Sequence, residues 1–494
     1  MDWTPKQLRQ LEAKIELKKR DTIESFYEFL KYFWDVIIQD DFIDNWHIKY
    51  LCDELQNMST FIVNREPKPY DLIINIPPGS SKSTITTVMF PVWMWLKDPS
   101  ISTLTSSFSA SLSTDHSIKS RDIVKSEKWD LLYGDYFKEA FGENLTLKKD
   151  RDNKTNWANN YNGERMVTST GGAATGRHAH LILVDDPLNP EQALSDVERV
   201  KANRFVDQTL STRKKDKEKT PTILIKQRLH EEDPTGNWLK KGKSIKHICL
   251  PAEDSIHVKP AELRSRYIDG YLDPVRLNRT VLDEARKDLG SYGYAGQYDQ
   301  TPAPAEGGII KRDWFQIISR DEFEHKYNAQ KPIVNYFVDT AYTKNVKNDA
   351  SGIIACCMIE KDLYVFKGKK MHVEFPELKR QLPIFCKQNK YDARSRVRIE
   401  PKANGLSVVQ ELQAIKEINV LTTKTPKDSK TTRLIASSAT IEMGRVFVVD
   451  DVWTDDFITE VCSFPNAKED EYVDILSYAV DFYFLNKKTL KVYS

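Results

Sequence analysis

Short apolar runs bounded by turn residues alternate with longer helical patterns from Asp71 onward. The runs are LIINI at 72–76, STLTSS at 102–107, LILVDD at 181–186 and TILIKQ at 222–227. Strands that alternate with helices in this way form parallel sheets covered on both faces. The chain before Asp71 differs, because Phe26, Leu30 and Phe33 recur at helical spacing. We therefore predict an α/β domain of the nucleotide-binding kind, preceded by a helical segment.

A second pattern begins in the later part of the chain. Residues 252–300 are charged, and we expect helical segments there. TPAPAEGGI at 301–309 has no periodicity and is typical of a domain boundary. After it, strands are expected at VNYFVDTAY, GIIACCMI, DLYVFKG and RVRIE, and a helix from Ser407. Because several strands precede the first clear helix, we predict a mixed sheet. We assign 1–304 to the first domain, with a linker subdomain at about 252–304, and 305–494 to the second.

Composition sets only broad limits. The chain has 494 residues and a formal net charge of +1 at pH 7, so it is not basic throughout, but a local basic face can still follow DNA phosphates. Six cysteines without a CxxC pair indicate a reducing cytoplasm rather than a disulfide framework. The most apolar stretch, 83–96, is shorter than the roughly 20 residues that a membrane span needs. We expect a soluble intracellular protein without a membrane segment.

LIINIPPGSSKSTITT places a strand directly before a turn and a helix start. ATP binding at such a turn needs backbone N–H groups around the phosphates, a lysine that reaches the β and γ oxygens, and a hydroxyl on Mg²⁺. Lys82 and Ser83 meet the last two needs. The match to GxxxxGK(S/T) is incomplete, since Ile76 and Ser81 stand where the two glycines belong. An ordinary strand-turn-helix is the alternative. The predicted ATP-binding residues here are Gly79, Ser80, Ser81, Lys82, Ser83 and Thr84.

Two acids end the run LILVDD. Asp185, at the end of a buried strand, is positioned to hold Mg²⁺ beside the Ser83 hydroxyl. Asp186 would then orient or activate the attacking water, because a general base must lie within hydrogen-bond reach of the proton it takes. A strand that ends at an Asp-Asp-Pro turn is the alternative. The loop after TILIKQ offers Gln227 and Arg228 as sensors of the γ-phosphate, although an arginine at a strand end is often only an ion-pair partner.

Trp46 and His47 in DNWHIKYL are the aromatic residues upstream of the loop. They are candidates to flank the adenine, or else an aromatic pair that packs a helix.

Four segments resemble, in this order, the large terminase subunits of tailed phages: PPGSSKST, FPVWMWLKDP, TGRHAHLILVDDPLN and IKQRLHEEDPTGNWL. VDTAY with a later NDASG, then RIEPKANG, KTTRLIASSATIEMGRV and FPNAKEDEYVDILSYA, resemble the nuclease domain of the same family. The resemblance runs from about residue 45 to 483. It implies a RecA-like P-loop ATPase domain joined to an RNase H-like nuclease domain.

The same resemblance implies a viral DNA-packaging motor. ATP hydrolysis would drive double-stranded DNA into a procapsid, and a two-metal endonuclease would cut concatemeric DNA. The implied partners are the portal protein, the small terminase subunit and further copies of the chain in a ring, typically a pentamer. The implied location is the host cytoplasm, with transient docking on the procapsid.

Two positions depart from the family pattern. Gly79 stands where many members have an arginine, so a stimulatory arginine must come from elsewhere. Arg177 resembles the position from which a neighbouring subunit inserts an arginine finger, and Arg121 is the alternative. Asp186 stands where the catalytic glutamate is usual, so its carboxylate reaches about one methylene less far.

Two-metal cleavage of a phosphodiester needs three or four carboxylates that converge on ions about 4 Å apart. Asp339 and Glu400 end apolar runs, so they lie at strand ends, and Asp474 lies in the first turn of an expected helix. Asp349 and Asp470 are further candidate ligands. Each acid alone has an ordinary alternative as a turn residue, an ion-pair partner or a helix cap. All-oxygen ligands favour Mg²⁺ or Mn²⁺ over zinc.

A basic loop, TTKTPKDSKTTR, lies near these acids in the sequence. We expect its cations to contact phosphates without sequence preference, because a translocating motor must pass any sequence. Solvated charge on a loop is the alternative. The candidates are Lys424, Lys427, Lys430 and Arg433.

Two other classes of protein remain open. A helicase or another translocase with the ATP site would leave Asp339, Glu400 and Asp474 without a function. A structural capsid-associated protein with degenerate sites would explain the missing glycines.

Overall fold

The computed structural model describes residues 4–172, 176–242, 244–302, 308–340, 350–400, 406–423, 428–465 and 470–485. The chain folds into two compact units. The N-terminal unit comprises residues 1–282 and 294–303, and the C-terminal unit comprises 283–293 and 304–494. Helix α11 (Arg279–Gln297) contributes to both, and its backbone leaves the helical conformation at Gly290. Each unit is built on one large sheet.

The N-terminal unit has an eight-stranded sheet in the order β3-β4-β5-β2-β6-β7-β1-β8. From β5 to β8 all neighbours pair in parallel, while β3 and β4 add an antiparallel edge. Strands β2, β6 and β7 are buried along their whole length, as expected where helices cover both faces of a parallel sheet. The strands are β1 (Asp71–Asn75), β2 (Thr103–Ser107), β3 (Leu147–Asp152), β4 (Asn156–Asn159), β5 (Glu164–Ser169), β6 (Leu181–Asp185), β7 (Thr222–Lys226) and β8 (Ile245–Cys249).

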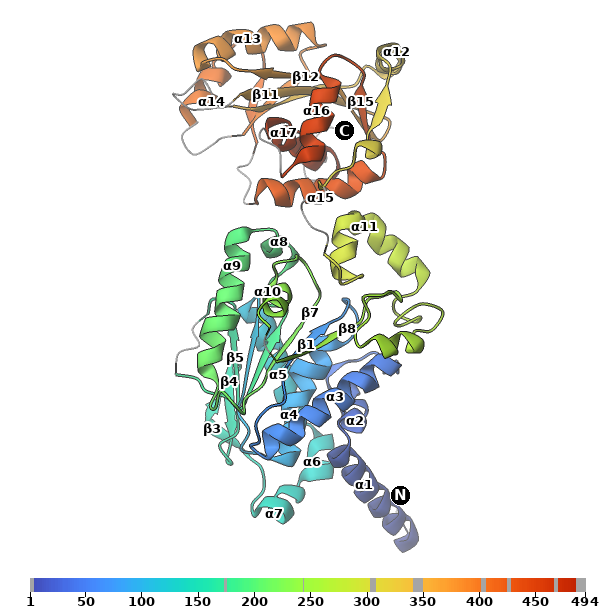
Figure 1. Ribbon diagram of the computed structural model, residues 1–494, viewed down its shortest axis with the longest axis vertical. Coiled ribbons are helices and arrows are strands. Elements are labelled where there is room, and N and C mark those ends of the chain that lie inside the picture. The colour runs from blue at the N-terminus through green and yellow to red at the C-terminus, as the bar shows by residue number, and fades with distance from the viewer. Residues whose placement is uncertain are drawn as a thin grey trace. The chain divides into compact units, whose positions relative to one another are not determined.

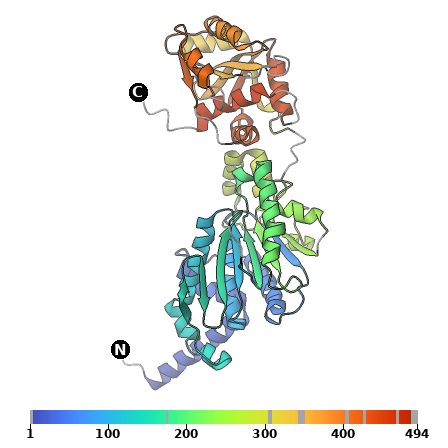
Figure 2. The ribbon, with the colours of Figure 1, turned by 90° about the vertical axis from the view of Figure 1, so that its left-hand side faces the viewer.

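Helices cover this sheet, and the strands lie side by side between them (Figures 1 and 2). After β1, a π-helical stretch, η1, continues into α4. Residues Phe90–Leu96 of α4 are all buried, so this helix packs as part of the core. The helical elements are α1 (Pro5–Glu24), α2 (Phe26–Ile37), α3 (Trp46–Val63), η1 (Thr84–Met89), α4 (Phe90–Lys97), α5 (Ala110–Val124), α6 (Glu127–Tyr133), α7 (Tyr136–Phe141), α8 (Pro190–Ala193), α9 (Asp196–Arg204), η2 (Phe205–Thr209), η3 (Leu210–Arg213), α10 (Pro234–Lys240) and η4 (Ala261–Arg266).

The C-terminal unit has a seven-stranded mixed sheet in the order β14-β13-β10-β11-β12-β15-β9. Strand β11 is antiparallel to both of its neighbours, and the other pairs are parallel. The C-terminal ends of β10 and β13 therefore meet at one edge of the sheet. The strands are β9 (Gln316–Ile318), β10 (Val334–Asp339), β11 (Ser351–Ile359), β12 (Asp362–Met371), β13 (Arg396–Ile399), β14 (Val420–Thr422) and β15 (Val446–Val449).

Two hydrophobic clusters cover the two faces of this sheet. One packs α12, α13 and α14 against residues such as Tyr336 and Ile353, and the other packs α15, α16 and α17 against Phe337 and Ile354; Figure 1 shows the two helical layers. Successive side chains of β10 and β11 belong to opposite clusters, because side chains along a strand point alternately to the two faces of the sheet. The helical elements are η6 (Arg312–Trp314), α12 (Arg320–Gln330), α13 (Phe375–Gln388), α14 (Leu406–Gln413), α15 (Lys430–Glu442), α16 (Thr454–Ser463), α17 (Glu471–Val480) and η7 (Asp481–Leu485).

The predicted α/β class, with a parallel sheet first and a mixed sheet second, is confirmed. The prediction of helical segments across 252–300 is wrong in its first half, where turns, bridges and the short η4 precede α11. Among the described helices, none is both long and apolar enough to cross a membrane.

Candidate functional site

The loop between β1 and η1 turns through two left-handed residues. Gly79 has φ +77° and Ser81 has φ +61°. The left-handed region is unfavourable for a residue with a Cβ atom, so Ser81 adopts the conformation that a glycine would adopt without strain. This is the second glycine position of the loop motif. The loop therefore makes a left-handed turn at position 81 although neither motif glycine is present.

Asp185 lies at the end of β6, and one strand, β7, separates it from β1. Its side chain is buried, and its Oδ1 accepts a hydrogen bond from Ser83 Oγ at 3.1 Å. Its Oδ2 accepts one from Thr87 Oγ1 at 2.9 Å. Burial, and then the neighbouring Asp186 carboxylate, raise the pKa of Asp185 above its ordinary value. Ser83 and Asp185 thus present two adjacent oxygens of the type that binds Mg²⁺, and these donors fit the predicted ion.

Asp186 is a further residue other than glycine in the left-handed region, with φ +41°. Its backbone is held on both sides, because its N–H donates to the Ile225 carbonyl at 3.0 Å and its carbonyl accepts from the Phe108 N–H at 2.9 Å. Its carboxylate accepts from the Gln227 N–H at 3.2 Å and lies 3.5 Å from Lys82 Nζ. Strained backbone of this kind persists where surrounding contacts impose it, often at functional sites.

His116 of α5 also approaches Asp185, with 3.5 Å between Nδ1 and Oδ2. Burial, with a smaller effect of the Arg165 guanidinium, lowers the pKa of His116 to about 4. The imidazole is therefore neutral at pH 7, and the contact is not an ion pair.

Gln227 and Arg228 follow β7 and differ in their surroundings. The side-chain Oε1 of Gln227 is buried and has no hydrogen-bond partner in the described part of the chain. Arg228 instead donates from Nε to Asp233 Oδ2 at 3.0 Å, and the same carboxylate binds the fully buried Lys226 at 2.6 Å. Gln227 is thus the better placed of the two candidate sensors, while Arg228 has the ion-pair role that was its alternative.

Trp46 and His47, the aromatic residues before the loop, differ in burial and in partners. His47 is fully buried, and its Nε2 lies 3.3 Å from the Ser80 carbonyl, so it packs behind the loop and is not exposed for stacking. Trp46 is partly exposed and packs against Tyr267, with ring centroids 5.7 Å apart.

The two candidate finger arginines have partners outside the ATP site. Arg177 donates from Nη1 to the Val167 carbonyl of β5 at 2.6 Å, and Arg121 pairs with Asp152 at 2.9 Å. Neither makes a hydrogen bond or ion pair with Asp185 or Asp186 among the described residues. An arginine finger that acts on a neighbouring subunit would not contact its own site, so Arg177 stays a prediction.

Three of the predicted nuclease acids lie at one sheet edge of the C-terminal unit. Val338 pairs with Ile399 in the parallel β10–β13 ladder, so Asp339 and Glu400 occupy the next row. Asp474 lies in the first turn of α17. Burial raises its pKa, and the Asp339 carboxylate adds to this effect, while Lys430 and Arg433 oppose it. The structure therefore brings together Asp339, Glu400 and Asp474; Asp349 lies outside the described residues.

Two cations from α15 lie among these acids. Lys430 Nζ is 2.8 Å from Asp474 Oδ2 and 2.6 Å from Asp470 Oδ1. Arg433 donates to the other oxygen of Asp474, and it lies 4.0 Å from Glu400. Two cations of the predicted basic loop, Lys430 and Arg433, thus contact the acids. The other two, Lys424 and Lys427, lie outside the described residues.

The fit of this cluster to metal ions is incomplete. Carboxylate oxygens suit Mg²⁺ and Mn²⁺, but in the described part of the chain no three Asp, Glu, His or Cys side chains form a group that could hold one ion. Lys430 bridges Asp470 and Asp474, and Arg433 bridges Asp474 and Glu400. In the described residues, these acids and cations form a network of ion pairs.

A prediction follows for Lys430. Its replacement by Met removes a cation that competes for Asp474, so we expect half-saturation by Mn²⁺ at an about tenfold lower concentration, equivalent to about 1.4 kcal/mol. Isothermal titration with Mn²⁺ measures this directly. Lys379→Met is the matched control, because Lys379 pairs at 3.3 Å with Glu411 away from the cluster. Unchanged Mn²⁺ affinity in Lys430→Met would show that Lys430 does not occupy a metal position.

No family model and no curated protein matches the sequence. Among solved structures, the large terminase of a thermophilic bacteriophage, in complex with ADP, aligns over 87% of this chain and 98% of its own, with 12% identity and a TM-score of 0.44. The HK97 bacteriophage large terminase aligns over 92% and 99%, with 9% identity and a TM-score of 0.34. The large terminase nuclease of the thermophilic phage G20c with bound magnesium aligns over 36% and 98%, with 17% identity and a TM-score of 0.27. The chain is similar to phage large terminases.

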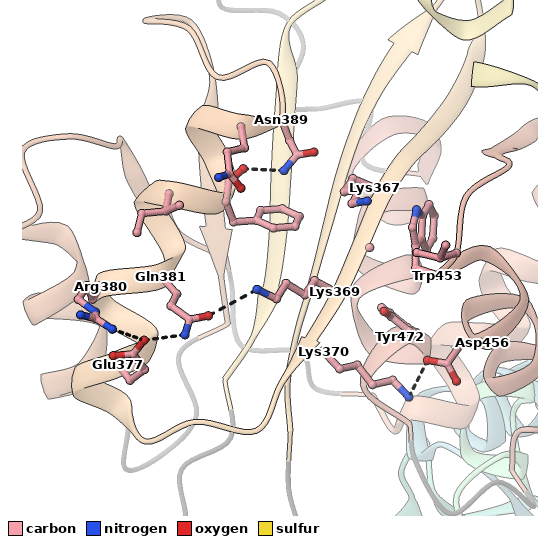
Figure 3. A pocket seen from close by; sticks show the side chains of 15 residues that line it. Lys367, Lys369, Lys370, Glu377, Arg380, Gln381, Asn389, Trp453, Asp456 and Tyr472 are labelled. Carbon is pink, nitrogen blue, oxygen red and sulfur yellow. Dashed lines mark hydrogen bonds and ion pairs between the residues drawn. The ribbon is translucent and has the colours of Figure 1, made fainter. Parts of the chain in front are cut away.

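A cavity of about 900 Å³ in the C-terminal unit is lined by none of the predicted nuclease acids. Figure 3 shows its lysines on β12, with Trp453 and Tyr472 on one side. Most of its cations are paired, since Lys367 lies 2.8 Å from Asp451 and Lys370 lies 2.5 Å from Glu460. Tyr472 belongs to α17, the helix that carries Asp474. The cavity therefore adjoins the helix that carries Asp474.

Several residues of the two sites were not predicted. Thr87 follows Ser83 and Tyr478 follows Asp474 by one helical turn, so helical spacing could have indicated both. Tyr478 donates its hydroxyl hydrogen to Glu400. Glu471 packs beside Gly352, the partner of Asp339 across β10–β11, and its Oε2 is buried without a hydrogen-bond partner among the described residues. His116 had no local signal, because only the fold brings α5 to β6.

Proposed function

We propose that the chain is the large subunit of a viral DNA-packaging terminase, a motor that couples ATP hydrolysis to the translocation of double-stranded DNA and cuts that DNA with a metal-dependent endonuclease. The observation that carries the proposal is the presence of two sites in one chain. One unit holds Lys82, Ser83 and Asp185 at a phosphate loop, and the other gathers Asp339, Glu400 and Asp474 at a sheet edge.

Each residue of the ATP site has a role that its geometry supports. The loop N–H groups at the start of the η1 helix would bind phosphate oxygens. Lys82 would leave Asp186 to neutralise the β and γ oxygens, and Ser83 and Asp185 would hold Mg²⁺, which balances phosphate charge. Asp186, freed from Lys82 but still oriented by the Gln227 N–H, would take the proton of the attacking water. Gln227 would contact the γ-phosphate or that water through its side-chain amide.

The nuclease roles rest on the acid cluster. Asp339, Glu400 and Asp474 would hold Mg²⁺ or Mn²⁺, with Asp470 and Asp349 as further ligands, and the ions would supply Lewis-acid chemistry at the scissile phosphate. Lys430 and Arg433 would exchange their carboxylate partners for DNA phosphates. Tyr478 would hold the Glu400 carboxylate in orientation.

The proposed partners follow from a motor of this class. They are double-stranded DNA, the portal protein, the small terminase subunit and further copies of this chain in a ring, with Arg177 offered to the ATP site of the neighbouring copy. The proposed place of action is the host cytoplasm and the procapsid vertex.

A nucleic-acid translocase without nuclease activity is the second candidate. The ion pairs of Asp474 favour it, because in the described residues Lys430 and Arg433 occupy both carboxylate oxygens that a metal would need.

Purified wild-type protein tests the proposal in one preparation. We expect ATP hydrolysis that depends on Mg²⁺, and conversion of supercoiled plasmid to nicked and linear DNA that depends on Mn²⁺ or Mg²⁺. EDTA should abolish both, and cleavage should persist without ATP because the sites lie on separate units. Hydrolysis without any cleavage would support the translocase instead, and the absence of both activities would contradict either function.

A further inference from the structure

The phosphate loop is held from outside by a guanidinium. Arg276, which follows β8 by 27 residues of mostly turn structure, donates from Nη1 to Ser81 Oγ at 3.1 Å. Its Nε donates to Asp273 Oδ2 at 2.6 Å, and its Nη2 donates to the Ile43 carbonyl at 2.8 Å. Three bonds in different directions fix the plane of the guanidinium. Ser81 therefore has a rigid donor at its side chain.

A second residue holds the same loop one position earlier. Burial comes first among the causes that lower the pKa of His47 to about 4, so the imidazole is neutral. Its Nε2 faces the Ser80 carbonyl at 3.3 Å, which requires the hydrogen on Nε2. Asn45 donates to the Leu272 carbonyl at 3.0 Å and so joins the start of α3 to the segment that carries Arg276. The start of α3 and the Arg276 segment thus form one support behind the loop.

The support contacts the loop at Ser81, the residue with the unfavourable backbone conformation. Ser81 occupies the second glycine position of the motif and has φ +61°. A glycine adopts this conformation at no steric cost, whereas a serine prefers to leave it. Hydrogen bonds to charged groups are among the stronger ones in proteins. The Arg276 bond is therefore well suited to offset the conformational preference of Ser81.

We propose that Arg276 is a positioning residue for ATP binding, which stabilises the left-handed conformation of Ser81 and so compensates for the glycine missing at position 81. The inference rests on the proposed ATPase function and deepens it. When the loop leaves this conformation, its N–H groups no longer point at the phosphates, and the apparent affinity falls by the fraction of molecules in the competent state. Arg276 acts through Ser81 and not on the reacting atoms.

The test compares Arg276→Gln in two backgrounds. In the wild-type background, we expect the Kd of a fluorescent ATP analogue and the KM for ATP to rise about tenfold, with kcat changed less than about threefold, since a tenfold change corresponds to the loss of one such bond. In the Ser81→Gly background, we expect the same substitution to change both by less than about twofold, because glycine holds the loop unaided. Arg264→Gln is the matched control, since Arg264 pairs with Asp254 at 2.8 Å in the same region and does not contact the loop.

The possible outcomes separate this inference from the proposed function. Wild-type protein that neither binds nor hydrolyses ATP would overturn both. Active wild-type protein with an unchanged Kd in Arg276→Gln would overturn the inference alone. An equal loss in the Ser81→Gly background would also overturn it, because Arg276 would then act on the nucleotide or on the fold. Thermal unfolding of each variant reports a general loss of structure, which glycine at position 81 would not rescue.

Discussion

Lys82→Ala is expected to lower the rate of ATP hydrolysis by about two to three orders of magnitude, the loss typical when one charge-stabilising donor is removed from an active site. The structure gives the reason. Lys82 starts the helix that follows the loop, is 8% exposed, and lies 3.5 Å from Asp186. No other cation in the described residues pairs with Asp186, so the variant leaves adjacent carboxylates at the site where the triphosphate must bind. Phosphate release during steady-state turnover measures the effect.

Lys49→Ala controls for the loss of a lysine from the same unit. Lys49 pairs with Asp53 at 2.6 Å on the exposed face of α3, and its removal should leave hydrolysis within about twofold, because exposed ion pairs contribute little. The cleavage of plasmid by Lys82→Ala should also match wild type. Wild-type hydrolysis in Lys82→Ala would show that this loop does not bind ATP.

Asp339→Ala is expected to reduce metal-dependent cleavage by at least about a thousandfold and to leave ATP hydrolysis unchanged. Asp339 is 4% exposed at the end of β10, on the row next to Glu400 and close enough to Asp474 to raise its pKa. A metal ion that loses one of its shared carboxylates loses the position from which it acts on the phosphate. The conversion of supercoiled plasmid in Mn²⁺, followed over time, measures the loss.

Asp362→Ala is the matched control for this variant. Asp362 begins β12, pairs with Arg445 at 3.0 Å and lies outside the acid cluster, so cleavage should stay at the wild-type rate. If Asp339→Ala cut DNA as fast as wild type, the acid cluster would not be the nuclease site.

The elements with a strong apolar pattern could be predicted from the sequence, and several other helices and strands could not. Strands β1, β6 and β7 were found because buried parallel strands are continuous apolar runs. Strand β3 was missed because LKKDRD is polar and largely exposed. Helix α13 was missed because Pro383 lies inside it, and proline normally ends a helical pattern. Helix α12 and strands β4, β5 and β8 were likewise not predicted.

The candidate sites show the same division. Sequence spacing places Ser83 after Lys82 and an acid at a strand end, and the fold then joins Ser83 to Asp185. Sequence spacing cannot show that Arg276 supports Ser81, because the two residues are 195 positions apart. It also did not show that Lys430 and Arg433 pair with Asp474, because the pairing depends on how α15 packs beside α17.

Gly352 limits how the C-terminal unit can be redesigned. A Cβ atom at this position would lie 3.0 Å from the Cβ of Glu471, so α17 packs on β11 at a separation that a larger residue would increase by a few tenths of an ångström. Asp474 is one turn further along that helix, and Asp339 is the cross-strand partner of Gly352. The separation of Asp474 on the helix from Asp339 on the strand thus depends on the close packing at Gly352, and Gly352→Ala would be expected to increase it slightly without altering any ligand.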